Sequence, residues 1–447
     1  MHTTSSYLDS MGTALAQVPK DFDGETRNAT HPDIGADEFT PTDFPLTGTY
    51  TIGGDSPDYQ TFTEAAADLN NLGVSGPVVF NVRDGSYEDQ ISLLDINGAS
   101  VTNTITFQSE SGDSSLVELT WAANDIRKYV VELVGTDYIT FRNMTLSATN
   151  ATYSLVFYFR GGLENVTITN CVLNGLGTSG NEYNNAVLYS DDAQFSNLVI
   201  SNNVISGGRS GVWIRSNSGN YASGTRIINN KCTGQFYDAV YLRYHVAPVV
   251  EHNSIVMSTG NYIWAIYLHN CTENLLVRYN RIKTNNYEGG IYIYYCDGTT
   301  SKRGLIANNF VECGGTSDGY GIALSYSNYQ RVYSNTVRIT TTNTSYGQAF
   351  NNYYGGNIEV KNQIWVADMP IMPTIPQQSL LQTTMTCSPL EIILLIITAG
   401  IGHRLRIYRL RAEWMPTPSQ PIPALLLPAI CILPAIISMV PVLSWHR

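Results

Sequence analysis

Short apolar segments recur along the middle of the chain at a nearly constant interval. The first kind is a run of alternating apolar residues that ends in Asn, and successive copies lie about 23 to 32 residues apart. Its copies occupy residues 139–143, 166–170, 198–203, 227–230, 249–253, 276–280, 305–309, 332–335 and 358–362. A repeat of this length predicts a solenoid, in which each period is one structural unit stacked on the next.

A second apolar segment keeps step with the first. It recurs about every 25 to 31 residues, at 186–189, 211–215, 239–243, 265–269, 290–294 and 321–325. Two short strands per period, joined by turns rich in Gly, Asn and Ser, predict one coil of a parallel β-helix. Alternation within the second strand directs these residues toward the core: Val212/Ile214, Val240/Leu242, Ile266/Leu268 and Ile291/Ile293.

The Asn that follows each first strand predicts a tight turn. Asn tolerates the left-handed backbone conformation that such turns require. An Asn amide that stacks on its equivalent one coil away also satisfies buried backbone groups. We therefore expect the Asn residues to form a ladder along the solenoid.

The start of the repeat region has a distinct order of elements. Residues 58–72 have the apolar spacing of one amphipathic helix, and an apolar strand, 77–82, follows directly. This order resembles the entry of the pectin-lyase-like superfamily, including pectin methylesterases, where a short helix covers the open end of a β-helix. The cover has a physical purpose, because the end of a solenoid exposes unpaired strand and core.

The repeats and this resemblance together predict an all-β fold. We expect a single-stranded right-handed parallel β-helix (solenoid) over residues 47–366 with an N-terminal capping helix, similar to bacterial surface and secreted repeat proteins. The motifs indicate fold rather than reaction. A GxxDFIFG-like strand of pectin methylesterases is missing. Asp191-Asp192 and Arg281-Ile-Lys283 mimic polygalacturonase motifs, but the NTD and GHG elements are missing too.

Residues 1–46 precede the repeats and contain clustered carboxylates. Their DxDGxxR…PDIGADE pattern, from Asp21 to Glu38, resembles the closing segment of bacterial surface β-helix repeats. We interpret this segment as the remnant of the end of a preceding repeat plus a linker, and expect the chain to be a fragment. Two interpretations of the acidic run stay open. We favour a clasp between Arg27 and carboxylates; a calcium site is the alternative, although the EF-hand spacing is not met.

The composition changes abruptly near residue 367. Residues 367–447 contain no Asn, two Gly and one Tyr, but 11 of the 18 prolines. Apolar runs at 392–401 and 424–445 flank a basic stretch at 403–411. We favour a non-native, out-of-frame tail, because the break has no folding rationale. The alternative is a weak hydrophobic anchor, in which Pro428, Pro434 and Pro441 would interrupt a membrane helix.

Composition narrows the classes of function. The net charge of −12 and the charged fraction of 14% argue against nucleic acid as a partner, because phosphates require clustered Lys and Arg. The seven cysteines show no CxxC pair and no regular spacing, which predicts buried single thiols rather than a zinc site or a disulfide framework. The N-terminus lacks a recognisable signal peptide.

Outward residues of one strand line up coil over coil in a β-helix. On the second strand one column reads Leu188, Trp213, Tyr241, Tyr267, Tyr292 and Ala323, and its neighbour reads Ser190, Arg215, Arg243, His269, Tyr294 and Ser325. Aromatic rings can cover the apolar side of a sugar, and Arg can hold a uronate carboxylate with two hydrogen bonds. The predicted carbohydrate-binding residues are Trp213, Arg215, Tyr241, Arg243, Tyr267, His269, Tyr292 and Tyr294. The alternative is that the aromatic residues only support neighbouring strands.

Catalysis is not assigned. The candidates on or beside these columns are Asp238, Arg243 and His269, with His245, Glu288 and Asp318 further along. A lyase of this superfamily needs a base, often Arg or Lys, and a hydrolase needs two or three carboxylates at the scissile bond. The sequence brings no such pair together. No metal ligand set and no cofactor other than calcium is predicted.

The expected function is an extracellular or cell-surface module that binds polysaccharide or another surface glycan, or mediates adhesion. Two alternatives stay open: a polysaccharide lyase or glycoside hydrolase, and a purely structural stalk. A membrane partner is expected only if the tail is a real anchor.

Overall fold

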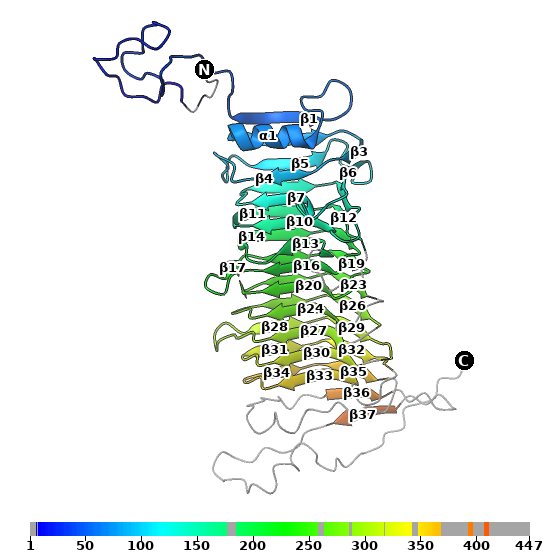
Figure 1. Ribbon diagram of the computed structural model, residues 1–447. Helices are drawn as coiled ribbons and strands as arrows, with labels where there is room; N and C mark the ends of the chain where they lie inside the picture. The colour runs from blue at the N-terminus through cyan, green and yellow to red at the C-terminus, as the bar shows by residue number, and fades with distance from the viewer. Residues whose placement is uncertain are drawn as a thin grey trace.

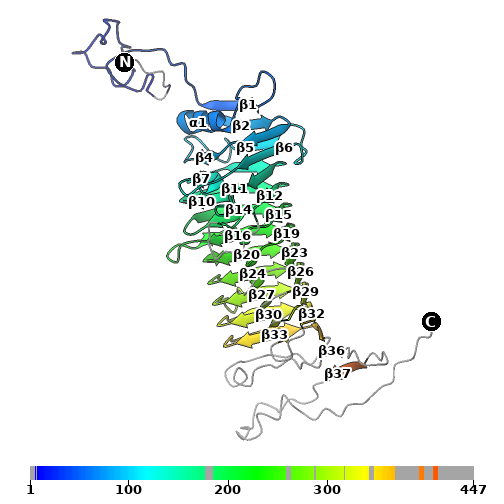
Figure 2. The same cartoon turned by 45° about the vertical axis from the view of Figure 1, so that its right-hand side comes forward.

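The computed structural model describes residues 6, 8–176, 185–257, 263–285, 288–316, 318–341, 347–367, 392–396 and 406–410. Over these residues the chain winds into a parallel β-solenoid of about 11 turns (Figure 1). This confirms the predicted right-handed parallel β-helix. Corresponding strands of successive turns pair into three long sheets, which Figure 2 shows from a second side.

Each turn of the chain passes through the first sheet, then the third, then the second. The first contains β1 (Leu46–Ile52), β2 (Val74–Val82), β5 (Ile105–Ser109), β8 (Ile139–Arg142), β11 (Gly162–Thr169), β14 (Gln194–Ser201), β18 (Arg226–Ile228), β22 (Val249–Glu251), β25 (Leu276–Arg278), β28 (Gly304–Ala307), β31 (Gln330–Tyr333) and β34 (Glu359–Lys361), with β17 (Ala222–Ser223) and β21 (His245–Val246) at its side. The second contains β4 (Ile91–Leu93), β7 (Tyr129–Val134), β10 (Leu155–Arg160), β13 (Leu188–Ser190), β16 (Ser210–Arg215), β20 (Asp238–Arg243), β24 (Ile263–His269), β27 (Glu288–Tyr294), β30 (Gly319–Ser325) and β33 (Gly347–Tyr353). The third contains β3 (Gly85–Glu88), β6 (Val117–Trp121), β9 (Thr145–Ala148), β12 (Val172–Asn174), β15 (Val204–Ser206), β19 (Lys231–Thr233), β23 (Ser254–Met257), β26 (Arg281–Thr284), β29 (Phe310–Cys313), β32 (Thr336–Ile339), β35 (Ile364–Ala367), β36 (Ile392–Ile396) and β37 (Arg406–Leu410).

The third sheet was not predicted. The periodicity predicts two strands per turn, whereas the structure has three sheets along the solenoid. Many of its strands are only three or four residues long and bury one or two side chains, as Ile205 does in β15 and Cys232 does in β19. Their outward positions mix polar residues with exposed apolar ones, such as Val204 in β15 and Phe310 in β29. Such a short run gives too little alternation to stand out from a turn.

The N-terminal end of the solenoid is covered by α1 (Phe62–Leu72), as predicted (Figure 1). The helix begins with a capping box, because the Thr61 hydroxyl accepts from the Glu64 backbone N–H and the Glu64 carboxylate accepts from the Thr61 backbone N–H. Phe62 and Leu69 are fully buried against the end of the core. The helix therefore shields apolar side chains that no preceding coil covers.

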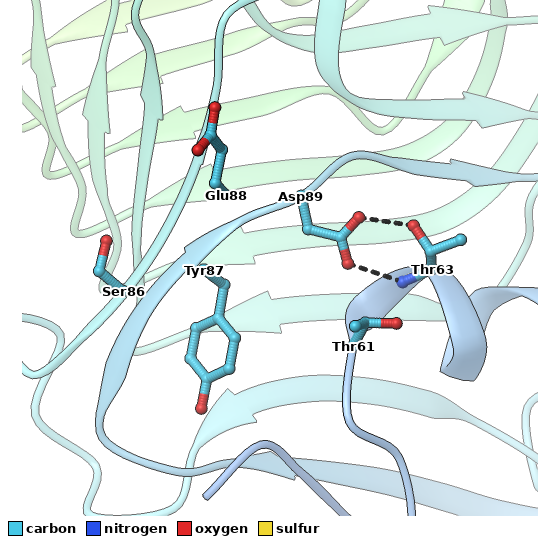
Figure 3. Close-up of a pocket in the computed structure, with 6 residues that line it drawn as sticks. All are labelled: Thr61, Thr63, Ser86, Tyr87, Glu88 and Asp89. Atoms are coloured by element: carbon cyan, nitrogen blue, oxygen red, sulfur yellow. Dashed lines mark hydrogen bonds between the residues drawn. The ribbon is translucent and has the colours of Figure 1, made fainter.

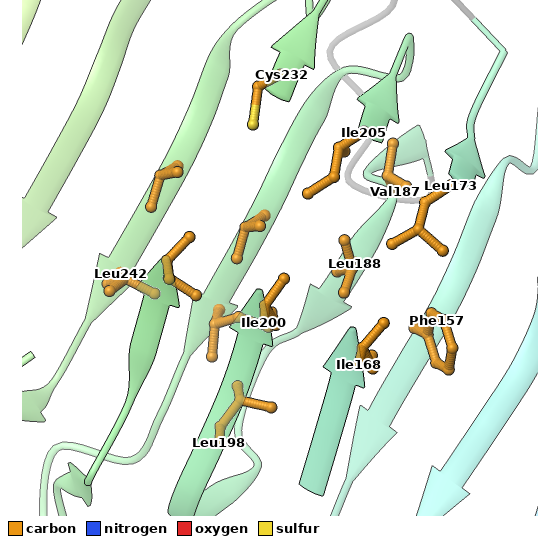
Figure 4. Close-up of a cluster of buried hydrophobic side chains, with 14 of the residues drawn as sticks. Phe157, Ile168, Leu173, Val187, Leu188, Leu198, Ile200, Ile205, Cys232 and Leu242 are labelled. Atoms are coloured by element: carbon orange, nitrogen blue, oxygen red, sulfur yellow. The ribbon is translucent and has the colours of Figure 1, made fainter. Parts of the chain in front are cut away.

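The core fills the interior of the coils with stacked apolar side chains (Figure 4). The residues predicted to point inward from β16, β20, β24 and β27 are fully buried. Near the N-terminus the stack is aromatic, with ring centroids 4.5 Å apart for Phe80 and Phe107 and 5.2 Å apart for Phe107 and Phe141. Like side chains in successive coils make one continuous core.

One predicted outward residue lies in this core. Leu188 is fully buried and pairs with Val212, whereas Tyr189 pairs with Trp213 on the outer face. The same shift carries Ser190, also predicted outward, into register with Ile214. The prediction was wrong there because it aligned this repeat one residue out of register, and a shift of one residue exchanges the two faces of a strand.

The Asn residues after the first-sheet strands occupy two different positions. The first position is left-handed and exposed, as at Asn202 (φ 58°) and Asn229 (φ 56°). The second position is the buried ladder: the Oδ1 atom of Asn253 accepts from the backbone N–H of Asn230 at 2.9 Å, and its Nδ2 donates to the Ile227 carbonyl at 2.9 Å. The same pattern runs through Asn203, Asn230, Asn253, Asn280, Asn309 and Asn335. The expected ladder is therefore present, one residue beyond the strained turn.

The acidic N-terminal segment folds around Arg27. Its guanidinium contacts the Glu38 carboxylate at 3.2 Å and the Gly35 carbonyl at 2.8 Å. The Asp33 carboxylate accepts from the backbone N–H groups of Ser10 and Phe39. This arrangement is the arginine–carboxylate clasp that the sequence analysis favours.

Little of the C-terminal region belongs to the described residues. The interpretation of residues 367–447 as a non-native tail or an anchor concerns residues that lie mostly outside the described part of the chain. Of this region, β36 pairs parallel with β35, and β37 pairs antiparallel with β36. No helix in the described part of the chain is long and apolar enough to cross a membrane. The predicted buried thiols are present at Cys171, Cys232, Cys271, Cys296 and Cys313; Cys387 and Cys431 lie outside the described residues.

Candidate functional site

The outer face of the second sheet carries a column of aromatic side chains, one from each of six successive turns. This outer aromatic column consists of Tyr158, Tyr189, Trp213, Tyr241, Tyr267 and Tyr292, which the strand register aligns. The predicted alignment of the last four is confirmed. Toward the C-terminal end the column continues as Ala323 and Asn351, so its aromatic part ends at β27.

Rings in the middle of the column cover one another. The Trp213 ring lies 5.1 Å from those of Tyr189 and Tyr241, at interplanar angles of 16° and 11°. Trp213 and Tyr241 are only 6% and 7% exposed. Their flat faces are occupied by neighbouring rings, which is the structural role that the sequence analysis gives as the alternative.

Toward β27 the rings turn and become accessible. Tyr267 meets Tyr241 edge-on at 82° and lies 33° from the plane of Tyr292, and both Tyr267 and Tyr292 are half-buried. Tyr294, in the neighbouring column, lies 5.4 Å from Tyr292 and 4.9 Å from His269. We call Tyr267, His269, Tyr292 and Tyr294 the open aromatic cluster.

The neighbouring column also contains the predicted arginines, in the predicted register with His269 and Tyr294. The guanidinium of Arg215 contacts the Asp191 carboxylate at 3.0 Å. Arg243 donates to the Tyr244 hydroxyl at 2.8 Å, and its guanidinium lies over the Tyr244 ring. Both arginines are thus held by neighbours at the edge of the sheet.

Burial fixes the protonation of the groups in this face. Desolvation, together with the charge of Arg243, lowers the pKa of His269 to about 4, so its imidazole is neutral at pH 7. Its Nδ1 lies 3.2 Å from the Tyr241 hydroxyl. Burial raises the pKa of the Tyr241 and Tyr267 hydroxyls, which keeps both protonated. The face therefore offers neutral hydrogen-bonding groups.

The catalytic candidates are only partly brought together. His269 and Arg243 are adjacent in register, and Asp238 lies at the start of the same strand as Arg243, largely buried. His245 was wrongly placed near this face, because it is fully buried inside the turn, with Nδ1 2.9 Å from the Thr225 hydroxyl. Asp318 directly precedes β30, and the Glu288 side chain lies outside the described residues.

A second group of tyrosines lies at the corner where the chain leaves the second sheet. Tyr295, Tyr326 and Tyr354, which we call the corner tyrosines, occupy the equivalent position in three successive turns, with φ of 50°, 50° and 55°. Earlier turns place Gly135, Gly161, Tyr244 and Asn270 at the same position, also with positive φ. A residue with a Cβ atom pays about 1–2 kcal/mol for this conformation, and Gly and Asn are the residues that usually adopt it.

The corner tyrosines form a continuous stack that is exposed at Tyr295 and Tyr354 and half-buried at Tyr326. The ring centroids are 4.8 Å apart for Tyr295 and Tyr326 and 5.4 Å apart for Tyr326 and Tyr354, at 7° and 10°. Tyr295 is 44% exposed and Tyr354 is 47% exposed. Tyr294 joins this stack to the open aromatic cluster, because its ring lies 4.5 Å from that of Tyr295. This stack was not predicted from the sequence, because residues beyond each strand were interpreted as turns. The Tyr-Tyr pairs at 294–295 and 353–354 are the signal that could have indicated it.

A polar hollow lies elsewhere, beside the capping helix (Figure 3). It is lined by Thr61, Thr63, Ser86, Tyr87, Glu88 and Asp89. The Asp89 carboxylate accepts from both the hydroxyl and the backbone N–H of Thr63, at 2.5 and 2.9 Å. Because this carboxylate satisfies a free N–H at the start of α1, we assign it a structural role.

No group of three or more His, Cys, Asp or Glu side chains suited to a metal ion occurs in the described parts of the chain. At Arg27, the carboxylates that the calcium alternative would use accept backbone N–H groups and the guanidinium instead. A calcium ion stays an untested expectation.

Comparison with known proteins agrees with the fold. The model of a family described as "right handed beta helix region" matches residues 129–337. No curated protein sequence matches the chain.

Three solved structures illustrate the structural likeness. A GH136 lacto-N-biosidase from Eubacterium ramulus is 12% identical, with a TM-score of 0.49 over 75% of this chain and 66% of that one, just under two thirds of its length. PfbA, a surface adhesin of Streptococcus pneumoniae, is 10% identical, with a TM-score of 0.38 over 79% and 90%. The pectin methylesterase from Aspergillus niger is 10% identical, with a TM-score of 0.26 over 79% and 85%. Likeness at this level carries no chemistry over to this chain.

Proposed function

We propose that this right-handed β-helix is an extracellular or cell-surface module that binds a polysaccharide through the outer face of its second sheet. The open aromatic cluster is the observation that carries the proposal. It offers three half-buried tyrosines and a neutral imidazole on one rigid surface. Tyr rings combine an apolar body with a polar hydroxyl, and a sugar ring has the matching apolar face and polar rim.

The middle of the outer aromatic column has a supporting part in this proposal. Trp213 and Tyr241 are largely covered by adjacent rings, so they hold the neighbouring Tyr267 in place rather than contact a ligand. Of the residues predicted to bind carbohydrate, Tyr267, His269, Tyr292 and Tyr294 keep that role. Rigid positioning matters because it reduces the entropy lost on binding.

Charge favours a neutral polymer over a polyuronate. Arg215 is neutralised by Asp191, and Arg160 by Glu132, with contacts of 3.0 and 3.1 Å. His269 adds no positive charge above about pH 4. The carboxylates of a uronate chain would therefore find few uncompensated cations on this face.

Catalysis is the less favoured alternative. A general base works best when its pKa is near the working pH, and the pKa of His269, at about 4, is too low for that role at neutral pH. Glu132 and Asp191, two carboxylates of this face, are each paired with arginine. A binding module requires neither group to be reactive.

Affinity gels test the proposal directly. The protein would be run through native gels that contain galactomannan, xylan, mixed-linkage β-glucan or polygalacturonate. We expect retention by at least one neutral polymer, with affinity reduced about tenfold or more by Tyr292→Ala and by Tyr294→Ala, since each removes a central contact. The matched control is Tyr333→Ala, which removes a half-buried tyrosine from the outer face of the first sheet.

Other outcomes decide between the alternatives. No retention on any polymer would contradict the proposal and favour a structural stalk. Release of reducing ends, or of unsaturated products that absorb ultraviolet light, would establish an enzyme instead, provided that Arg243→Ala or His269→Ala abolishes the release. Equal loss of retention in all three tyrosine variants would indicate general destabilisation rather than a site.

A further inference from the structure

We infer that the corner tyrosines extend the carbohydrate-binding surface, so that a neutral polysaccharide chain lies along the solenoid axis from the open aromatic cluster over Tyr295, Tyr326 and Tyr354. The inference rests on the proposed function. It adds a second part of the site, a direction for the bound chain and a reason for an unusual choice of residues.

The first argument is the backbone conformation that these tyrosines adopt. The chain itself shows that the corner accepts Gly135, Gly161 and Asn270, residues for which a left-handed conformation carries little or no penalty. Tyrosine in the same conformation is strained. Three successive turns use the strained residue where Asn would serve, and strained residues of this kind cluster at binding and active sites.

The second argument is the exposure of the rings. A tyrosine that only supported the fold would bury its ring, as Tyr241 does. Tyr295 and Tyr354 instead expose 44% and 47% of their surface, and Tyr353 beside them exposes 43%. The protein therefore holds a row of aromatic edges and hydroxyl groups in solvent on a rigid support.

The third argument identifies the occupant. The Tyr294 ring lies 5.4 Å from that of Tyr292 on one side and 4.5 Å from that of Tyr295 on the other, so the stack is continuous with the proposed binding surface. A ligand that leaves the open aromatic cluster meets Tyr295 next. The rows run from coil to coil, which suits an elongated polymer rather than a compact sugar.

The chemistry of the strip favours a neutral chain. The ring neighbours of the corner tyrosines are tyrosines, whereas an arginine guanidinium lies over Tyr244 at 4.6 Å and over Tyr279 at 5.5 Å. Phenol hydroxyls donate and accept hydrogen bonds without charge. Sugar hydroxyls are matching partners, and a row of anions would gain nothing here.

Substitution by Asn separates function from support. Tyr295→Asn, Tyr326→Asn and Tyr354→Asn, singly and together, place in each turn the residue that the chain already uses at Asn270. We expect the thermal midpoint to stay within a few degrees of the unchanged protein, because relief of backbone strain offsets the lost ring stacking. We expect the triple variant to bind the retaining neutral polymer at least tenfold more weakly.

The matched control is Tyr279→Asn. Tyr279 is also left-handed (φ 59°) and 44% exposed, and it also stacks on a neighbouring ring, that of His252 at 4.8 Å. It lies at a different corner, beyond the first sheet. The same change in strain and exposure should therefore leave binding unaltered.

Chain length provides a second readout. Affinities for oligosaccharides of increasing length, cut from the retaining polymer, should rise further for the unchanged protein than for the triple Asn variant. Short oligosaccharides, which fit the open aromatic cluster alone, should bind both proteins equally. This pattern is not expected from a purely structural effect.

The outcomes are distinguishable from those of the proposed function. If Tyr292→Ala weakens binding but the triple Asn variant does not, the corner inference is overturned and the proposed function stands. If no polymer is retained at all, both fail. A fall in the thermal midpoint that accompanies weaker binding would assign the tyrosines to support. Self-association that Tyr326→Asn abolishes, measured by analytical ultracentrifugation, would assign them to a second copy of the chain.

Discussion

Single residues at equivalent places in successive turns decide how this solenoid closes its corners. At the first corner a left-handed residue is followed by a buried Asn, whose amide bonds to backbone groups of adjacent coils. At the second corner the buried position is taken in turn by His245, Cys271, Cys296 and Ser327. The Cys296 backbone N–H donates to the Ser327 hydroxyl at 3.0 Å. Small polar atoms inside each corner thus satisfy backbone groups that the strands leave unpaired.

The buried His245 predicts a pH dependence of stability. Desolvation lowers its pKa from 6.5 to about 4 in the folded protein. The unfolded chain therefore binds a proton between pH 6.5 and 4 that the folded protein does not bind, so the free energy of unfolding falls as pH falls through this window. The full effect is about 3 kcal/mol, and it is absent above pH 6.5.

The measurement compares urea midpoints of the unchanged protein and His245→Gln from pH 7.5 to 4. Gln keeps a polar side chain near the Thr225 hydroxyl and does not titrate. We expect the difference in free energy of unfolding between the two proteins to change by roughly 3 kcal/mol between pH 6.5 and 4. Parallel curves would show that His245 does not set this dependence.

The Asn residues in the sequence predicted that a ladder exists, but they did not show which Asn of each turn belongs to it. Asn marks both the left-handed position and the buried position, and Asn202-Asn203 and Asn229-Asn230 carry both. Where only one Asn is present, as at Asn253 or Asn143, the sequence alone does not show which position it holds. The difference depends on which face of the turn the amide meets, and that is set by the neighbouring coils.

At the scale of elements, the close approach of the second and third sheets constrains the strands. Strands of the second sheet place a small residue at one inward position: Gly211, Ala239, Ala265, Gly290, Gly321 and Ala349. A Cβ atom added to Gly321 would lie 2.1 Å from Val337 Cγ1 and 2.6 Å from the Ala349 carbonyl oxygen. The distance between the sheets therefore depends on this column.

Gly321→Ala should destabilise the protein by about 1–3 kcal/mol, because the new methyl group overlaps its neighbours. Val337→Ala, introduced together with it, should recover part of that loss, although the contact with the Ala349 carbonyl persists. The control is Gly162→Ala, where a Cβ atom meets nothing within 4 Å. Chemical denaturation compares the unchanged protein, Gly321→Ala, Val337→Ala, the double variant and the control. Purely additive effects of Gly321→Ala and Val337→Ala would contradict the proposed contact.

The elements with strong local signals were predictable. The capping helix has an apolar stripe and a capping box, and the β16, β20, β24 and β27 strands alternate cleanly. The third sheet was missed because a strand such as β19 buries only Cys232. Leu188 was wrongly assigned to the outer face because the register of β13 depends on pairing with β10 and β16 rather than on its own three residues.

At the scale of the whole molecule, the cysteines report on the integrity of the coils. Cys171, Cys232 and Cys313 lie in different turns, and burial raises the pKa of each thiol to about 12. A thiol reacts through its thiolate and only when a reagent reaches it. In the folded protein these thiols are therefore both protonated and out of reach of the reagent.

Thiol labelling should therefore follow unfolding. We expect Cys171, Cys232, Cys271, Cys296 and Cys313 to resist maleimide at pH 8 in the native protein and to react only within the denaturant transition. Peptide mass spectrometry identifies each cysteine, and the order of labelling shows whether the solenoid opens coil by coil or in one step. Native labelling at the rate of a free thiol would show that the coils are open.

The whole-molecule repeat was visible in the sequence, whereas the proposed binding surface was visible only in part. Periodicity aligned Tyr241, Tyr267 and Tyr292 correctly. It could not show that stacking hides Trp213, or that Tyr294 connects the sheet to Tyr295, because both depend on how side chains rotate and cover one another. The rings that we propose to contact a ligand are distinguished from the supporting rings only by their exposure.

The corner that accepts Gly, Asn or Tyr also has a genetic consequence. The codons for Asn and Tyr differ only in their first base, so a single point mutation converts one residue into the other. Each such mutation would add or remove one ring at the edge of the solenoid without disturbing the register of the coils. A gene for this protein can therefore lengthen or shorten its row of tyrosines by one coil at a time, through single-base changes at a corner where the chain already carries both residues.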